Sequence, residues 1–386
     1  MGASLLCSMK LRWDIFCTSI DNFGDVGFSW RLARQLVNEH GLEVRLWVDD
    51  LAIFSQIESA IDVDEDQQWL QGVEICSWRK SFAEIEPADV VIETFACTLP
   101  DNYILAMADL PQQPVWINLE YLSAENWTLD CHCLPSFHPH LPLKKYFFFP
   151  GFVEGTGGLL LEKNLLPARV AFNNTSQDKF WQELGLQSRR EGELCISLFC
   201  YDDAPIEELL SAWVISDVPI RVLVPQHSVN NAIGIFFGVD LPTAGQVLQS
   251  GKLQVCIIPF LTQDNYDELL WACDINFVRG EDSFVRAQWA ERVFIWNIYP
   301  QAEHSHRLKL EAYLNLYTER MPPEMSAAVF SLWNAWNGNG QMINAWSIFA
   351  AQMSALTEYG NNWIRQLLPI GDLASNLVKF SRKDQI

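Results

Sequence analysis

The sequence predicts an α/β protein built from two Rossmann-like domains that follow each other along the chain and face each other across a cleft. In both halves, short apolar and β-branched runs alternate with helical or loop segments, which is typical of parallel sheets covered by helices. A glycine-rich stretch at residues 155–158 separates the two arrays and is the best linker candidate in the chain. In such a fold, ligands bind at the carboxyl ends of the strands.

The predicted strands are apolar runs bounded by polar turns. In the first half they cover Trp13–Ser19, Glu43–Val48, Val73–Ser77, Asp89–Glu93, Val115–Leu119 and Tyr146–Phe152. In the second half they cover Leu194–Phe199, Ile220–Val224, Leu253–Ile258, Ile275–Val278 and Val293–Ile298, with helices predicted over Asp264–Ala272 and Phe284–Ala290. These runs place an N-terminal domain at residues 1–155, a linker region at 156–190 and a C-terminal domain at 191–359. The tail has a helical pattern, and we expect its last helix, about residues 360–386, to return to the N-terminal domain.

Composition and charge exclude several classes of protein. At 386 residues, with 49% apolar and 19% charged residues, the chain is globular and long enough for two hydrophobic cores. Its formal net charge of −22 argues against nonspecific binding of nucleic acid and against an anionic membrane surface. No apolar run reaches the ~18 residues of a membrane span, and the first residues do not resemble a signal peptide. Because the ten cysteines are scattered and several lie in apolar runs, we expect reduced thiols and a cytoplasmic protein.

Two acids and two glycines follow the first predicted strand and precede an amphipathic helix. They are Asp21, Gly24, Asp25 and Gly27. Both glycines permit positive φ and a close approach of the backbone to a ligand. The spacing differs from the G-x-G-x-x-G dinucleotide motif, and two carboxylates would repel a phosphate at the helix N-terminus, so a cationic or proton-donating group suits them better. Alternatively, Asp21 caps the turn and Asp25 caps the helix, and this stretch alone does not decide between the two interpretations.

Other polar motifs of the first half are interpreted as structural. Glu93 and Glu120 each end a predicted strand. Glu120 fits either an acceptor-binding loop or a structural cap or ion pair, and the structural role is favoured. Cys131-His132-Cys133 invites a zinc site, but C-x-C spacing does not readily set two thiolates in one tetrahedron as C-x₂-C does. No metal site is therefore expected.

A second polar cluster follows the predicted strand Ile275–Val278 and opens a helix. Gly280 frees the turn, Asp282 and Ser283 offer hydrogen-bonding side chains, and Arg279 supplies a cation. A helix N-terminus beside an arginine suits a diphosphate without a metal ion. Aromatic and amide side chains that end other strands would hold a pyrimidine base. They are Phe199, Tyr201, Phe260 and Gln263.

Three long motifs resemble one known family. They are Asp21-Asn22-Phe23-Gly24-Asp25-Val26-Gly27 with Trp30-Arg31-Leu32-Ala33, then Arg279-Gly280-Glu281-Asp282-Ser283-Phe284-Val285-Arg286-Ala287-Gln288-Trp289-Ala290, then Trp296-Asn297-Ile298-Tyr299-Pro300-Gln301. The family is that of the bacterial protein-arginine rhamnosyltransferases that modify translation elongation factor P (EF-P), the EarP family. Motifs of this length rarely match by chance, and the resemblance runs from about Trp13 to the C-terminal helices.

The resemblance implies a GT-B glycosyltransferase fold, with an N-terminal acceptor domain and a C-terminal sugar-nucleotide domain. It implies an inverting hexosyltransferase that moves L-rhamnose from dTDP-β-L-rhamnose to an arginine on a basic loop of EF-P, without metal ion or cofactor. By position, the family's catalytic acids fall on Asp21, Asp25 and Glu281. Its nucleotide pocket falls on Phe199, Tyr201, Phe260, Gln263, Arg279, Asp282 and Ser283.

These residue types suit the implied chemistry. A guanidinium is a poor nucleophile because its pKa exceeds ~12 and its lone pair is delocalised. Two carboxylates can hold it bidentately, aim one nitrogen at the anomeric carbon and accept a proton as the bond forms. We expect Asp25 to act as the base and Asp21 to orient the guanidinium. Glu281 would hold the sugar or the nucleophile, while Arg279 and Tyr201 would stabilise the charge that develops on dTDP.

Two other functions are compatible with the same residues. A GT-B glycosyltransferase with a different small-molecule or lipid acceptor would share the C-terminal pocket but would not need paired acids after the first strand. A noncatalytic nucleotide-binding or partner-binding protein would keep its function when Asp25 is replaced by asparagine. The paired acids and the effect of that substitution therefore separate the three interpretations.

Overall fold

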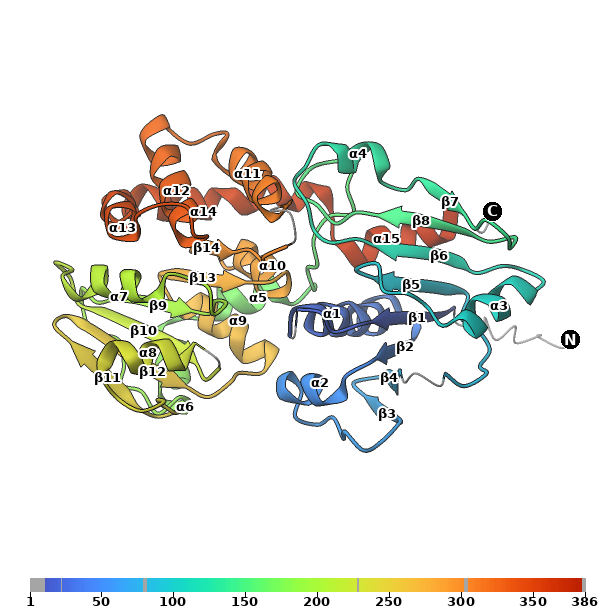
Figure 1. Ribbon diagram of the computed structural model, residues 1–386, viewed down its shortest axis with the longest axis horizontal. Coiled ribbons are helices and arrows are strands. Elements are labelled where there is room, and N and C mark those ends of the chain that lie inside the picture. Colours follow the sequence, from blue (N-terminus) through green and yellow to red (C-terminus); the bar gives the residue numbers. More distant parts are fainter. Residues whose placement is uncertain (1–10, 22, 79–81, 228, 302–304, 384–386) are drawn as a thin grey trace, which may run out of the picture. The chain divides into compact units, whose positions relative to one another are not determined.

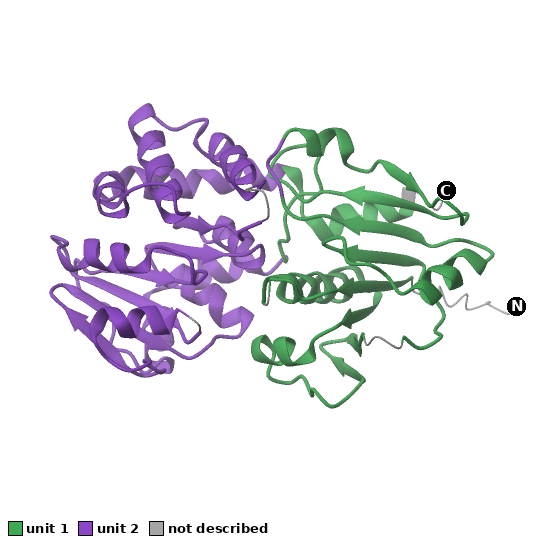
Figure 2. Cartoon of the chain, viewed as in Figure 1, with its two compact units in different colours: residues 1–122, 126–162, 370–386 green, residues 123–125, 163–369 purple. Residues whose placement is uncertain are grey.

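Apolar runs of the sequence become the strands of two separate sheets (Figure 1). The computed structural model describes residues 11–21, 23–78, 82–227, 229–301 and 305–383. The chain divides into unit 1, with residues 1–122, 126–162 and 370–386, and unit 2, with residues 123–125 and 163–369 (Figure 2). Most of unit 2 is therefore inserted between two parts of unit 1.

Unit 1 contains an eight-stranded sheet. In spatial order its strands are β3 (Gln67–Leu70), β4 (Val73–Ser77), β2 (Glu43–Val48), β1 (Arg12–Cys17), β5 (Val90–Thr94), β6 (Val115–Leu119), β8 (Lys144–Phe148) and β7 (Pro135–Phe137). The predicted strands of this half form the parallel centre, and the expected strand Tyr146–Phe152 is shifted toward the N-terminus as β8. The sequence missed the edge strands β3 and β7, which pair antiparallel. Their exposed side chains, Trp69 and Phe137 among them, do not form a continuous apolar run.

The helices of unit 1 include one that comes from the far end of the chain. They are α1 (Phe23–His40), α2 (Leu51–Ile57), α3 (Asp101–Asp109), α4 (Trp127–Cys131) and α15 (Leu373–Lys383). α15 buries Leu373 and Leu377 completely, and its Phe380 ring lies 5.1 Å from the ring of Tyr146 on β8. Gly371 precedes α15 and packs closely against Gly158. A Cβ on Gly158 would lie only 2.4 Å from the carbonyl oxygen of Gly371. The last helix is thus part of the core of unit 1.

Unit 2 contains a six-stranded sheet. In spatial order its strands are β11 (Val247–Ser250), β12 (Leu253–Ile258), β10 (Ile220–Pro225), β9 (Leu194–Leu198), β13 (Ile275–Arg279) and β14 (Val293–Asn297). The predicted strands pair in parallel, and the unpredicted β11 pairs antiparallel with β12 at the edge. Each parallel strand is almost entirely buried, which explains the apolar runs in the sequence.

The helices of unit 2 bury many aromatic side chains. They are α5 (Leu165–Ala171), α6 (Asn174–Glu183), α7 (Ile206–Val214), α8 (Asn230–Phe237), α9 (Gln263–Ala272), α10 (Asp282–Trp289), α11 (Ser305–Thr318), α12 (Pro323–Trp336), α13 (Met342–Ala350) and α14 (Met353–Leu367). The ring of Tyr313 on α11 stacks 5.7 Å from Trp333 on α12 and lies edge-on to Phe284 on α10 at 4.8 Å. These contacts attach the C-terminal helices to α10, which follows strand β13.

Residues 156–190, expected to be a linker region, hold folded structure instead. Residues 156–162 belong to unit 1, and the remainder belongs to unit 2 with α5 and α6. Phe180 and Trp181 of α6 are buried in the same hydrophobic cluster as Cys195 and Leu223 of the unit 2 sheet. The polar composition of this stretch hid two helices, each of which packs through few apolar residues.

The Cys131-His132-Cys133 motif has a structural role that its sequence suggested. The Nδ1 atom of His132 accepts a hydrogen bond of 3.0 Å from the backbone N–H of Phe149, and its ring lies 4.5 Å from the ring of Phe148. Burial disfavours the charged imidazolium and lowers the pKa of His132 to about 4. Within the described residues, no group of three or more His, Cys, Asp or Glu side chains could hold a metal ion.

We expect His132 to make unit 1 less stable at mildly acidic pH. Its folded pKa lies below its ordinary value of 6.5, so its contribution to stability is complete above that value and is lost as the pH falls toward 4. His132→Asn removes the titration while keeping an acceptor oxygen, and should reduce the drop in the urea midpoint between pH 7.5 and pH 5. The exposed His140 offers a matched control, since His140→Asn should keep the wild-type drop. Equal drops in all three proteins would contradict the assignment.

Candidate functional site

Both sheets have a topological switch point, where the strand order reverses. In unit 1 the switch lies between β1 and β5, and in unit 2 it lies between β9 and β13. Open α/β sheets bind ligands outside the carboxyl ends of their strands at such points. Arg279 ends β13, and the other predicted site residues follow the carboxyl end of a strand. The residues that come after β1, β9 and β13 lie at the two switch points.

The stretch after β1 is more helical than expected. α1 begins at Phe23, so Gly24, Asp25 and Gly27 lie in its first turns. Neither Gly24 nor Gly27 uses the positive φ that glycine permits, because neither is among the glycines with positive φ. Gly24 has another reason to lack a side chain, since a Cβ there would lie 2.8 Å from Oδ2 of Asp21. The close approach is thus made by a carboxylate of the chain itself.

Asp21 and Asp25 are brought together as predicted, and both are buried. Oδ2 of Asp25 accepts hydrogen bonds from the backbone N–H groups of Ile20 (2.9 Å) and Asp21 (2.8 Å). Only 1% of Asp25 and 8% of Asp21 is exposed. Asp25 therefore holds the loop that carries Asp21. Its backbone oxygen accepts a 2.9 Å bond from the hydroxyl of Ser29.

The two residues after β5 have an unusual backbone conformation that no sequence pattern predicts. Phe95 and Ala96 have φ of 57° and 55°, a left-handed conformation that costs non-glycine residues roughly 1–2 kcal/mol each. The Phe95 ring stacks 4.4 Å from Tyr121 and lies 5.2 Å from Phe28 of α1. Such strain gathers at functional sites, and this one borders the switch point of unit 1.

Glu93 and Glu120, which also end strands, have partners within unit 1. Nζ of Lys145 lies 2.8 Å from Oε2 of Glu93, whose pKa is raised chiefly by burial. Nδ2 of Asn118 donates a 2.6 Å hydrogen bond to Oε1 of Glu120. These contacts fit the structural interpretation favoured for Glu120.

The predicted nucleotide-binding residues of unit 2 gather around one guanidinium. Arg279 is the last residue of β13, and its Cζ lies 4.6 Å from the ring of Phe199 and 4.7 Å from the ring of Tyr201. Pairing between β9 and β13, with Leu198 opposite Phe277, places these three residues at the same edge. The Phe260 ring lies 6.4 Å from that of Phe199. Strand ends that are distant in sequence therefore meet as predicted.

The turn from β13 into α10 is tightly held. Gly280 has φ of 61°, which glycine adopts without strain, as the sequence predicted. The hydroxyl of Ser283 accepts a 3.2 Å hydrogen bond from the backbone N–H of Arg279 and donates to its carbonyl oxygen. Nε2 of Gln263 donates to Oδ2 of Asp282 at 3.3 Å. Both predicted polar residues of the turn therefore contact other predicted site residues.

Three further aromatic side chains border this cluster and were missed from the sequence. His227 and Tyr266 lie edge-on to Phe199 at 4.9 and 5.9 Å, and Tyr299 lies 5.5 Å from Tyr201. Burial and, secondarily, the charge of Arg279 lower the pKa of His227 to about 3, so this ring is neutral near pH 7. His227 follows the end of β10, so the strand-end rule used for Phe199 could have found it.

Glu281 has a partner that the sequence did not indicate. Nζ of Lys309, on α11, lies 2.9 Å from Oε1 of Glu281 at the N-terminus of α10. The two side chains are 12% and 9% exposed. The carboxylate is thus held in an ion pair that is largely shielded from water.

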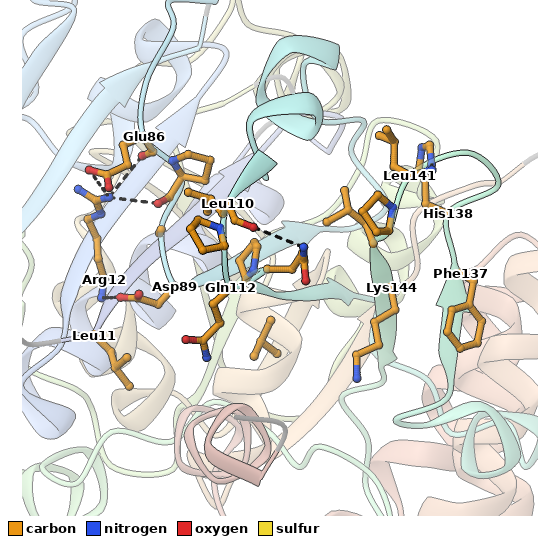
Figure 3. A pocket seen from close by; sticks show the side chains of 18 residues that line it. Leu11, Arg12, Glu86, Asp89, Leu110, Gln112, Phe137, His138, Leu141 and Lys144 are labelled. Atoms are coloured by element: carbon orange, nitrogen blue, oxygen red, sulfur yellow. Dashed lines mark hydrogen bonds and ion pairs between the residues drawn. The ribbon is translucent and has the colours of Figure 1, made fainter. Parts of the chain in front are cut away.

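A pocket of about 1020 Å³ lies elsewhere in unit 1, at the amino ends of its strands (Figure 3). Residues that begin or precede β1, β5 and β8 line it, among them Arg12, Asp89 and Lys144. Figure 3 shows Arg12 bonded to Glu86 and Asp89, both on the lining. No predicted site residue lines this pocket. The pocket therefore lies at the amino ends of the strands, whereas the acid pair lies at their carboxyl ends.

The two switch points offer opposite charges. Unit 1 presents two buried carboxylates, which suit a cation, whereas unit 2 presents Arg279 and the first amides of α10, which suit an anion. The aromatic faces of Phe199 and Tyr201 add a surface for a planar ring.

Among the helices of the described residues, none combines the length and apolar character that crossing a bilayer requires.

Arg279 should be irreplaceable by lysine, because lysine lacks the planar group that contacts two rings. We expect Arg279→Lys to weaken the binding of dTDP, the nucleotide that the family resemblance implies, by about tenfold or more, as measured by isothermal titration calorimetry. Arg189→Lys is a matched control, since Arg189 pairs with Asp274 before β13. Wild-type affinity in Arg279→Lys would contradict the assignment.

The chain is similar to known proteins over almost its whole length. Residues 13–382 match the family model described as Elongation-Factor P (EF-P) rhamnosyltransferase EarP. The protein-arginine rhamnosyltransferase of Pseudomonas putida is 46% identical over 376 residues, which cover 97% of this chain and 99% of that protein. The protein of the same name from Pseudomonas aeruginosa is 44% identical over 370 residues, which cover 95% and 98%.

Solved structures show the same fold. A structure described as the structural basis for EarP-mediated arginine glycosylation of translation elongation factor EF-P matches with a TM-score of 0.70 and 35% identity, over 97% of this chain and 99% of that one. UDP-GlcNAc 2-epimerase from Neisseria meningitidis, 10% identical, matches with a TM-score of 0.50 over 96% and 99%, which shows the fold alone. The predicted GT-B fold is confirmed. From its match over residues 13–382 and its close relatives, this chain belongs to the EarP family.

Proposed function

We propose that this chain transfers L-rhamnose from dTDP-β-L-rhamnose to an arginine side chain of EF-P, with inversion at the anomeric carbon and without a metal ion. The observation that carries the proposal is the buried pair Asp21 and Asp25 at the switch point of unit 1, in a member of the EarP family. A neutral or lipid acceptor would gain nothing from two buried carboxylates, whereas a guanidinium matches them in charge and geometry.

Unit 2 supplies the features that a thymidine diphosphate sugar needs. The rings of Phe199 and Tyr201 offer faces to the base, and Arg279 lies against both rings. Its positive charge and the amides at the start of α10 would stabilise the diphosphate as the bond to rhamnose breaks. These groups are fixed by the turn around Ser283, so little rearrangement is needed during the reaction.

Unit 1 supplies the features that a guanidinium nucleophile needs. Its nitrogens become nucleophilic only if a proton leaves as the new C–N bond forms. Two backbone N–H groups hold Oδ2 of Asp25 in place, and we assign proton removal to Asp25 and orientation of the guanidinium to Asp21. Glu281 of unit 2 would add negative charge near the oxocarbenium-like transition state.

The test is mass spectrometry of EF-P after incubation with this protein and dTDP-L-rhamnose. We expect the mass of one deoxyhexose on a single arginine, with an α linkage by NMR if the β donor is inverted. Asp21→Asn and Asp25→Asn should each lower kcat by at least about a hundredfold while dTDP still binds, because an amide cannot take the proton or match the positive charge.

The control for these substitutions is Asp50→Asn, since Asp50 caps α2 and asparagine caps a helix equally well. It should transfer rhamnose at the wild-type rate. Unmodified EF-P would overturn the assignment of the acceptor, and a β linkage would overturn the inversion. Full turnover by Asp25→Asn would overturn the role of the acid pair.

Transfer should also be insensitive to chelation. Because Arg279 and helix amides supply the positive charge beside the diphosphate, we expect 10 mM EDTA to leave kcat within about twofold of its value in buffer. Added Mg²⁺ should not restore or raise it. A loss of turnover in EDTA that Mg²⁺ reverses would show that a metal ion takes part.

A further inference from the structure

A largely buried lysine lies against the carboxylate that the proposed mechanism places near the sugar. Nζ of Lys309 and Oε1 of Glu281 are 2.9 Å apart, and the two side chains are 12% and 9% exposed. Lys309 comes from α11, which follows the last strand of the sheet, whereas Glu281 directly precedes α10. The two residues are brought together by tertiary packing, so no local motif in the sequence reveals their contact.

The packing of α11 on α10 fixes this contact. Lys309 and Tyr313 are four residues apart and therefore share one face of α11. The Tyr313 ring lies 4.8 Å from Phe284 of α10, and its hydroxyl donates a 2.9 Å hydrogen bond to Oε1 of Gln288. Gln288 also accepts a 2.7 Å bond from Trp363. The face that carries Lys309 is thus docked on α10 at two points beyond the ion pair.

Stability alone gives little reason for such a pair. Removing two charges from water costs about as much as their attraction returns, so shielded ion pairs contribute little net stability. Their effect is to restrict the geometry of the charged groups. Cations are also scarce in this chain, which carries 26 Lys and Arg against 48 Asp and Glu. One of them is nevertheless held beside Glu281.

We propose that Lys309 is a positioning residue that holds the carboxylate of Glu281 in its working orientation. This inference rests on the proposed function, because it takes Glu281 as a group that acts on the sugar or the nucleophile. Lys309 bonds to Glu281, whereas the nucleotide is assigned to Arg279, Phe199 and Tyr201. Its loss should therefore slow turnover without weakening the binding of dTDP.

The test compares Lys309→Met with Lys309→Arg in rhamnose transfer to EF-P. Methionine keeps the length and apolar stem of lysine but removes its charge. We expect Lys309→Met to lower kcat by about ten- to a hundredfold, since a displaced catalytic group costs up to about a hundredfold. The KM for dTDP-rhamnose and the Kd for dTDP should stay within about threefold. Lys309→Arg, which keeps a cation, should recover kcat to within about threefold of wild type.

A double substitution shows whether Lys309 acts through Glu281. Glu281→Gln should already have low kcat, and adding Lys309→Met should change it by less than about twofold, because the group being positioned is gone. Lys179→Met is the matched control, as Lys179 pairs with Glu183 on the exposed face of α6 and should turn over at the wild-type rate.

Several outcomes would overturn the inference. Wild-type kcat in Lys309→Met would show that the pair is dispensable, and equal losses in the methionine and arginine variants would show a packing role only. A weaker Kd for dTDP with unchanged kcat would make Lys309 a phosphate ligand. The same loss in the Glu281→Gln background would show that the two residues act independently.

These outcomes are distinct from failure of the proposed function. If wild-type protein transfers no rhamnose, or if Glu281→Gln turns over normally, then the proposed reaction or the role of Glu281 is wrong, and the role of Lys309 falls with it. If wild-type protein is active, Glu281→Gln is slow and Lys309→Met is normal, then only the positioning role is wrong.

Discussion

Parallel pairing between the first and the fifth strand of each sheet, counted along the chain, is the constraint on which the candidate sites depend. In unit 1, β1 pairs with β5, and in unit 2, β9 pairs with β13, although long stretches of chain separate the partners. Parallel strands end at the same edge, so this pairing brings the start of α1, through Ser29, beside Thr94 and brings Phe199 beside Arg279. A single rule of sheet geometry therefore builds an acidic site in one unit and a basic site in the other.

Most of the fold followed from the sequence because its parallel strands are buried on both faces. Such strands read as continuous apolar runs, whereas the edge strands β3, β7 and β11 have exposed side chains and gave no signal. The first turns of α1 were also misjudged. Gly24 looked like a turn residue, yet it lies in a helix and makes room for the Asp21 carboxylate.

The candidate site was predictable where function falls on strand ends and unpredictable where it depends on packing between helices. Arg279, Phe199 and Tyr201 meet because their strands are neighbours, which the alternation of elements implied. Lys309 reaches Glu281 only because α11 docks on α10, and no spacing in the sequence encodes that contact. The left-handed backbone at Phe95 and Ala96 was equally hidden, since these residue types usually avoid it.

The path of the chain has a consequence for biosynthesis. The core of unit 1 includes α15, whose Leu373 and Leu377 are completely buried. This core therefore cannot pack completely until α15 has left the ribosome. Unit 2 is finished earlier, because all its strands and helices precede residue 370. During translation, unit 2 can fold first, while unit 1, which carries the acid pair, still exposes part of its hydrophobic core to solvent. Truncation of a few C-terminal turns would leave that half exposed to proteases and aggregation.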